Sequence, residues 1–143
     1  MADLERFLAL LESLRQSLAT LERYRLTVER DRLIHEVDAQ NMVLFALYRA
    51  VQGAIDLGQH LIAERGLAVP AAYREVFRSL SDGGLVTADL GARLQGWAGF
   101  RNIIAHDYGV LDMQRVATAL HDELGDLHEF AKAMATYAVS EPG

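Results

Sequence analysis

The chain has 143 residues, of which 51% are hydrophobic and 24% charged, and its net charge is −6. These values predict one globular domain over residues 1–143 and exclude extensive disorder. The acidic balance argues against broad electrostatic capture of nucleic acid, and the absence of cysteine excludes disulfides, thiolate catalysis and cysteine metal sites. Thirteen of the fourteen basic residues are arginines, so a local basic groove stays open as an alternative.

The N-terminus lacks the basic start and apolar block of a signal peptide, and no apolar run reaches ~18 residues. We therefore expect a cytoplasmic protein without a membrane segment. The first predicted helix carries an apolar stripe at heptad spacing, which allows two interpretations: a face packed inside a helical bundle, which we favour, or a seam for a partner. The stripe consists of Leu4, Phe7, Leu11, Leu14, Leu18 and Leu21.

A charged connection follows at residues 22–32, where Thr27 is a candidate cap for a second helix over residues 32–64. The middle of that helix is apolar on all sides, which predicts the most buried helix of the fold. Gly53 and Gly58 predict close packing against a neighbour, because glycine in a helix costs about 1 kcal/mol relative to alanine.

A polar stripe lies on one face of this helix, formed by Arg49, Gln52, Asp56 and His60. It is either the wall of a binding groove or a solvated face. Gly66 is expected to end the helix. A short helix should then bury Tyr73, Val76, Phe77 and Leu80.

Thr87 is expected to cap a helix over residues 88–106, and Asp112 to cap a last helix that runs to about residue 140. His121 and His128, seven apart on that helix, are expected on a solvated face. No strand is predicted, since periods near 3.6 dominate. The expected fold is an all-α bundle of four main helices plus one short helix.

The polar residues that suggest chemistry lie at the end of the 88–106 helix, where Arg101, Asn102 and His106 occur together. Arginine binds phosphate through paired hydrogen bonds, and the ordinary pKa of histidine, near ~6.5, suits proton transfer at neutral pH. No serine or cysteine nucleophile adjoins His106, and the five histidines show no metal-binding pattern. An Arg and a His suit RNA cleavage, in which the substrate's own 2′-hydroxyl attacks. The structural alternative is a histidine placed at the negative end of a helix.

Arg101 and His106 are about 140° apart on an ideal helix, so they converge only if the helix ends at His106 or if a second subunit contributes. A stripe of mostly small residues on the same helix indicates close approach of another backbone, from this chain or from a second copy. The stripe is Gly91, Gln95, Gly99, Asn102 and His106.

The segment from Arg101 through Asn102 to His106 matches the RNxxxH form of the motif of HEPN domains. Continued to Tyr108, it resembles the RxxxxHxY motif of HepT-like toxins, and residues 54–60 are similar to the central helix of that family. The resemblance implies a HEPN-like bundle that forms a homodimer and acts as a metal-independent endoribonuclease without a cofactor. It also implies the toxin half of a bacterial toxin–antitoxin pair. The antitoxin would be an MntA-type nucleotidyltransferase that neutralises the toxin by adding AMP to the motif tyrosine.

By position in the motif, Arg101 would hold the phosphate, His106 would handle the proton, and Tyr108 would be modified. Asn102 would support the site, and Gln52, Asp56 and His60 are expected to support RNA binding from the central helix. Asp107 occupies a variable position and is assigned no chemistry. RNA is the expected substrate, and neither DNA nor a membrane is an expected partner. Two alternatives remain: a catalytically silent HEPN domain that binds a nucleotide or a partner protein, and an adaptor bundle that uses the Leu4–Leu21 stripe.

Overall fold

The computed structural model describes residues 2–140, except for the side chains of Ala2, Tyr108, Val139 and Ser140. The part of the chain that it describes contains seven α-helices, one 3₁₀ turn and no strand. In chain order these are α1 (Ala2–Thr27), α2 (Arg30–His35), α3 (Val37–Glu64), α4 (Tyr73–Asp82), α5 (Ala88–His106), η1 (Tyr108–Val110), α6 (Met113–Asp122) and α7 (Gly125–Ser140). The all-α bundle is confirmed. No helix among residues 2–140 is long and apolar enough to cross a membrane.

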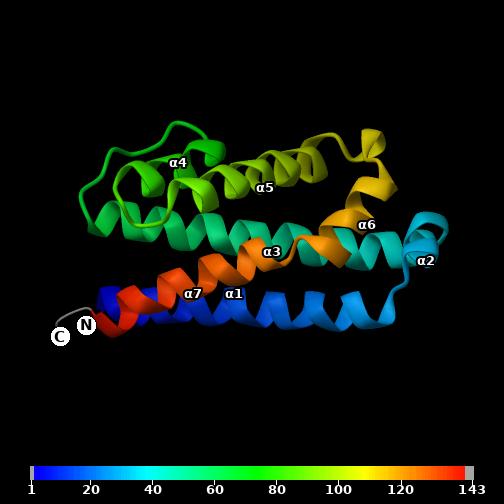
Figure 1. Cartoon of the computed structure of the whole chain (residues 1–143), viewed down its shortest axis with the longest axis horizontal. Coiled ribbons are helices and arrows are strands. Elements are labelled where there is room, and N and C mark those ends of the chain that lie inside the picture. The colour runs from blue at the N-terminus through cyan, green and yellow to red at the C-terminus, as the bar shows by residue number, and fades with distance from the viewer. Residues whose placement is uncertain (1, 141–143) are drawn as a thin grey trace.

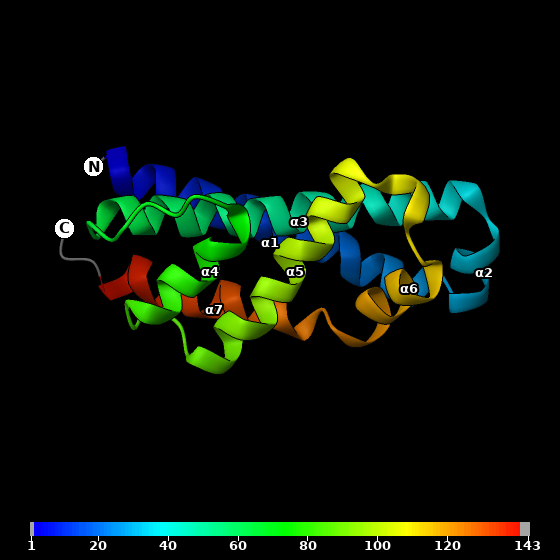
Figure 2. The same ribbon diagram turned by 90° about the horizontal axis from the view of Figure 1, so that it is seen from above.

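The long helix α3 lies in the middle of the bundle, as its apolar sequence predicts. In Figure 1, α1 and α7 lie on one side of it and α4 and α5 on the other. Seen from above, α5 crosses α3 obliquely, and α6 lies beside α2 at the far end of the bundle (Figure 2). Thirteen residues of α3 are buried, including Val43, Leu47, Ala54 and Leu61.

The heptad stripe of α1 is an internal face of the bundle. Phe7, Leu11, Leu14, Leu18 and Leu21 are all buried, and α1 packs mainly on α3. The interpretation as an intramolecular face is therefore confirmed.

Two expectations about the predicted 32–64 helix are wrong: its cap at Thr27 and its continuity. Thr27 does not cap a new helix, because α1 continues to it and its hydroxyl donates to the carbonyl of Arg23 at 2.8 Å. Glu36 takes an extended conformation (φ −107°, ψ 117°) and divides the segment into α2 and α3. This break lets α2 turn onto α6, where Arg30 pairs with Asp122 and Leu33 is buried. Tertiary packing thus overrides the continuous helical pattern.

The predicted last helix is also divided, into α6 and α7, at Glu123 and Leu124. Two histidines connect these helices to the first part of the chain; His128 is exposed, as expected, whereas His121 is half-buried, so the expectation of a solvated face is wrong for His121. The Nε2 atom of His121 lies 2.9 Å from the carbonyl oxygen of Val28, and that of His128 lies 2.8 Å from a carboxylate oxygen of Glu22. Burial acts to raise the pKa of Glu22, but hydrogen bonds and attraction from Arg25 and His128 outweigh it and lower this pKa below its ordinary value.

The predicted caps at Thr87 and Asp112 and one of the predicted close contacts are confirmed. The Thr87 hydroxyl accepts from Leu90 N–H at 3.1 Å, and the Asp112 carboxylate accepts from Gln114 N–H at 2.9 Å. Gly66 ends α3 with a φ of +66°. A Cβ atom on Gly58 would lie 2.9 Å from Val76 Cγ1, so α4 packs directly on the α3 backbone there.

Candidate functional site

Arg101 is the one charged residue among the buried residues that the structure describes, with 7% of its surface exposed. Its guanidinium turns from α5 toward α3 and donates three hydrogen bonds. Nε donates to Gln52 Oε1 at 2.9 Å, and the terminal nitrogens donate to Tyr48 Oη and Asn102 Oδ1 at 3.1 Å each. All three acceptors are neutral groups.

Two aromatic rings hold the plane of the guanidinium. The Arg101 Cζ atom lies 4.9 Å from the ring centre of Tyr48 on α3 and 4.6 Å from that of Tyr73 at the start of α4. No carboxylate of the described residues forms an ion pair with Arg101. Burying a charge without an opposite charge is costly, so the site holds a cation that is ready for an anionic ligand.

Asp56 acts on Arg101 through Gln52. Its carboxylate accepts a hydrogen bond from Gln52 Nε2 at 2.9 Å. Because a carboxylate only accepts hydrogen bonds, the nitrogen of the Gln52 amide must face Asp56 and the oxygen must face Arg101. The two hydrogen bonds that link Asp56, Gln52 and Arg101 therefore fix the orientation of the guanidinium, just as a residue hydrogen-bonded to a metal ligand orients that ligand.

His106 is the last residue of α5, which ends where the sequence predicts. The following residue, Asp107, leaves the helix with φ −136° and ψ 40°, and its N–H donates to the carbonyl of Ile103 at 2.8 Å. The His106 ring is exposed and makes no hydrogen bond or ion pair with any described residue. Arg101 is therefore buried and His106 exposed, five residues apart on the same helix.

The remaining predicted residues fall into three groups. Asn102 and Gln52 contact Arg101 directly. His60 does not join them: it lies two helical turns beyond Gln52, about 12 Å along the helix axis, where its ring contacts Phe7 at 5.9 Å and its Nε2 lies 3.6 Å from Glu64. The Tyr108 backbone belongs to η1, but its side chain lies outside the described part of the structure.

The glycines on α5 leave room for two parts of α4: its backbone next to Gly91 and the Arg74 side chain next to Gly99. A Cβ atom on Gly91 would lie 2.8 Å from Ser81 Cβ and 3.3 Å from the carbonyl oxygen of Phe77, so this glycine admits α4 of the same chain. A Cβ on Gly99 would lie 3.4 Å from an Arg74 nitrogen. Gly96, one position off the predicted stripe, has open space above it.

The sequence analysis missed both tyrosines that contact Arg101, because Tyr48 lies in the apolar middle of the central helix and Tyr73 was expected in the core. The expectation for Tyr73 is wrong, since 37% of its surface is exposed. One signal was available: Tyr48 lies four residues before Gln52, and Gln52 four before Asp56, so the three share a helix face.

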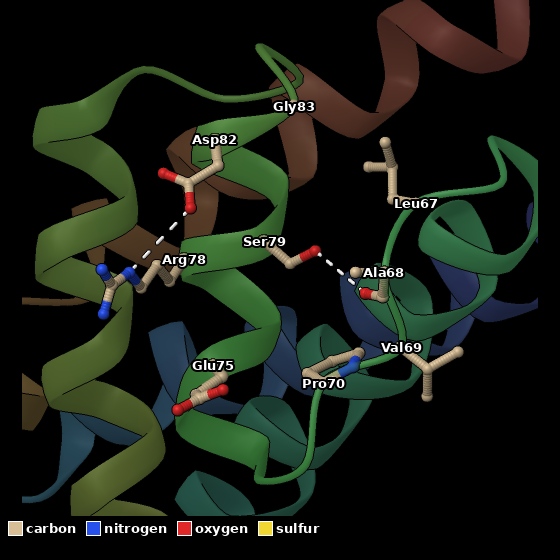
Figure 3. Close-up of a pocket in the computed structure, with 9 residues that line it drawn as sticks. All are labelled: Leu67, Ala68, Val69, Pro70, Glu75, Arg78, Ser79, Asp82 and Gly83. Atoms are coloured by element: carbon tan, nitrogen blue, oxygen red, sulfur yellow. Dashed lines mark hydrogen bonds and ion pairs between the residues drawn. The ribbon is translucent and has the colours of Figure 1, made fainter.

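A separate hollow of about 450 Å³ lies between α4 and the connection at residues 67–70. Figure 3 shows its lining, in which Arg78 faces Asp82 and the Ser79 hydroxyl donates to the carbonyl of Ala68 at 3.4 Å. Neither Arg101 nor His106 lines it, so we do not assign it to the site.

Comparison with known proteins identifies relatives of the whole bundle. Residues 14–134 match the family described as ribonuclease HepT-like. The chain is 31% identical to the mRNA nuclease HepT of Shewanella oneidensis over 91 residues. This aligned region covers 64% of this chain and 68% of that protein.

Two solved structures share the fold. The tri-AMPylated Shewanella oneidensis HEPN toxin, solved in complex with an MNT antitoxin, aligns with a TM-score of 0.82 at 22% identity, over 91% of this chain and 96% of the toxin. A chain from a toxin–antitoxin crystal structure with AMP-PNP aligns with a TM-score of 0.81 at 20% identity, over 95% of this chain and 99% of that one.

Proposed function

The chain belongs to the ribonuclease HepT-like family and is an endoribonuclease, and we propose that Arg101 and His106 carry out its cleavage of RNA without a metal ion. The observation that carries the proposal is Arg101: a buried cation, oriented by three neutral acceptors and two rings, with no carboxylate partner among the described residues. Such a group binds a phosphate and stabilises the negative charge that develops on it during cleavage.

The proposed reaction uses the 2′-hydroxyl of the RNA as the nucleophile. The bond from O2′ to phosphorus forms and the bond from phosphorus to O5′ breaks, which gives a 2′,3′-cyclic phosphate and a 5′-hydroxyl. His106 takes the proton from the 2′-hydroxyl, and the departing O5′ receives a proton from a second His106 or from water. Arg101 binds the oxygens of the same phosphate throughout.

We propose that two copies of the chain form the working enzyme. His106 is exposed to solvent whereas Arg101 of the same chain is buried, which supports a site completed by a second subunit. Phe45 supports the same idea: it is 63% exposed and lies one helical turn before Tyr48, which contacts Arg101, with the exposed Met42 beside it on α3. Large exposed apolar residues next to a site mark a surface that a partner covers.

The toxin–antitoxin role is the biological part of the proposal. A nucleotidyltransferase antitoxin would transfer AMP to the hydroxyl of Tyr108, in line with the AMPylated state and the MNT partner of the Shewanella oneidensis toxin. Tyr108 follows His106 by two residues, so each AMP would place bulk and negative charge close to His106. RNA phosphate would then be repelled and its path blocked, without unfolding of the toxin.

Cleavage is tested with labelled single-stranded RNA and purified protein in EDTA. The wild type should cleave, and His106→Ala should lose activity at least about a hundredfold, in the range of general acid–base contributions. A terminal 2′,3′-cyclic phosphate, detected by mass spectrometry, is the expected product. Unchanged cleavage by His106→Ala would remove His106 from the mechanism, and a wild type that binds RNA without cleaving it would favour the silent-domain alternative.

The shared site is tested by complementation. Arg101→Met and His106→Ala proteins, each inactive alone, should regain activity when mixed, because one of the two sites in a mixed dimer contains both residues. Failure to recover, while light scattering shows that both variants still dimerise, would place each site within one chain. Phe45→Glu should give monomers, whereas Val69→Glu, at an exposed position in the 67–70 connection, should not.

Modification is tested by co-expression with an MntA-type nucleotidyltransferase. Wild-type toxin should gain the mass of one or more AMP units on Tyr108 and lose activity. Tyr108→Phe should gain none. If the antitoxin still neutralised Tyr108→Phe, inhibition would come from binding alone.

A further inference from the structure

A second group of cations lies on the outer face of α5, outside the proposed catalytic residues. Arg74, in the first turn of α4, and Arg115, in the first turn of α6, line one groove of about 490 Å³. Its floor is formed by Gly96, Gly99 and Asn102 of α5. We propose that Arg74 and Arg115 bind backbone phosphates of the RNA next to the one that is cleaved; the inference rests on the ribonuclease function proposed above.

Both arginines are placed to contact a ligand. Arg74 forms no hydrogen bond, ion pair or ring contact with the described residues, so none of them competes with a ligand for its guanidinium. Arg115 is anchored at one nitrogen by Glu123 at 2.6 Å, and its Cζ lies 5.5 Å from the ring centre of Phe100. An exposed surface ion pair of this kind contributes little and exchanges easily for a phosphate contact.

The floor of the groove keeps the space between the two arginines open. A Cβ atom on Gly99 would lie 3.4 Å from an Arg74 nitrogen, so glycine there lets the guanidinium lie close to the α5 backbone. Gly96 has nothing within 4 Å of its Cβ position. The other lining residues, Phe100 and Ile103, carry no charge, so no residue that lines the groove is acidic, in a chain with 20 acidic residues.

Asn102 joins this groove to the proposed catalytic residues. Its side chain lines the groove, while its Oδ1 accepts a hydrogen bond from Arg101 at 3.1 Å. An RNA strand whose cleaved phosphate lies at Arg101 therefore passes Asn102 to reach the groove. Contacts from the two arginines to backbone phosphates would position the strand and carry no sequence information.

Binding is measured by fluorescence anisotropy with a 2′-O-methyl RNA, which cannot be cleaved by attack of its own 2′ oxygen. Arg74→Gln and Arg115→Gln should each weaken binding roughly threefold to tenfold and lower the slope of log Kd against log salt by about 0.7. The double variant should combine the losses. Arg15→Gln, an exposed position of α1 on the other side of α3, removes the same charge and should bind within about twofold of wild type.

Kinetics separate this role from catalysis. With cleavable RNA, the double variant should lose kcat/KM while kcat at saturating RNA stays within about threefold of wild type, because these contacts are the same in ground and transition states. Unchanged affinity and salt slope in the double variant would overturn the inference and leave the ribonuclease function intact. An equal loss in Arg15→Gln, or a variant that light scattering shows to be monomeric, would also overturn it. A wild type that binds RNA through these arginines without cleaving it would refute only the proposed function.

Discussion

The uncompensated charge of Arg101 makes an unusual prediction about stability. Replacing Arg101 by Met removes the charge and keeps an unbranched apolar stem, whereas Lys keeps the charge and loses the planar fork. Chemical similarity would rank Lys as the milder change. The structure predicts the opposite: the Met variant should be more stable than the Lys variant, although both should be less stable than wild type.

The magnitude follows from the contacts of the guanidinium. Its three hydrogen bonds, at 2.9, 3.1 and 3.1 Å, each contribute about 1.5–3 kcal/mol, and each ring contact adds roughly 0.5–2 kcal/mol. A lysine ammonium keeps about one of these hydrogen bonds but still buries a charge, which costs several kcal/mol. Methionine keeps none and buries no charge. The Lys variant should therefore unfold about 1–3 kcal/mol more easily than the Met variant.

The assay is urea unfolding followed by far-UV circular dichroism, in a buffer free of phosphate and sulfate. Protein concentration is held constant, because association raises the apparent free energy of unfolding. A Lys variant more stable than the Met variant would refute the reasoning, since the buried charge would then be favourable without an anion. Added sulfate provides a control: at ten times its Kd it should stabilise the wild type by about 1.4 kcal/mol and leave the Met variant unchanged.

Three further predictions concern the rest of the chain. Asp56→Asn frees the Gln52 amide to turn, so kcat should fall roughly threefold to tenfold with KM nearly unchanged in steady-state kinetics. Urea unfolding should show that Gly58→Ala lowers the free energy of unfolding by about 1–3 kcal/mol, because the added methyl overpacks against α4. Gly96→Ala, in open space, should raise it by about 0.5–1 kcal/mol. Glu22→Gln should lower the free energy of unfolding by about 0.5 kcal/mol at pH 7. Because folding lowers the pKa of Glu22, this contribution is complete above the unfolded-state pKa and is lost as the pH falls through the folded-state value. The free energies of unfolding of the two proteins should therefore converge in acid.

The helices with strong periodicity and local caps were predictable from sequence. The α1 stripe, the Thr87 and Asp112 caps and the end of α5 at His106 depend on residues within a few positions of each other. The breaks at Glu36 and Glu123 were not predictable in this way. Both let a helix pack onto a distant part of the chain, α2 onto α6 and α6 onto α1.

The same distinction holds for the site. Arg101, Asn102 and His106 adjoin each other in sequence, so a motif was enough to select them. The residues that orient Arg101 come from α3 and α4, about 50 positions earlier for Tyr48 and Gln52, and their roles depend on how the helices cross. Arg74 and Arg115 lie on separate helices, and no sequence spacing relates them.

A net charge of −6 is compatible with RNA binding because position matters more than the sum. At physiological salt, charges more than about 8–10 Å apart across solvent are largely screened. A phosphate in the groove on α5 would therefore interact mainly with Arg74 and Arg115, and little with the acidic residues of α1 beyond α3. Two carboxylates on this side of the bundle, Asp56 and Glu123, already accept hydrogen bonds from Gln52 and Arg115.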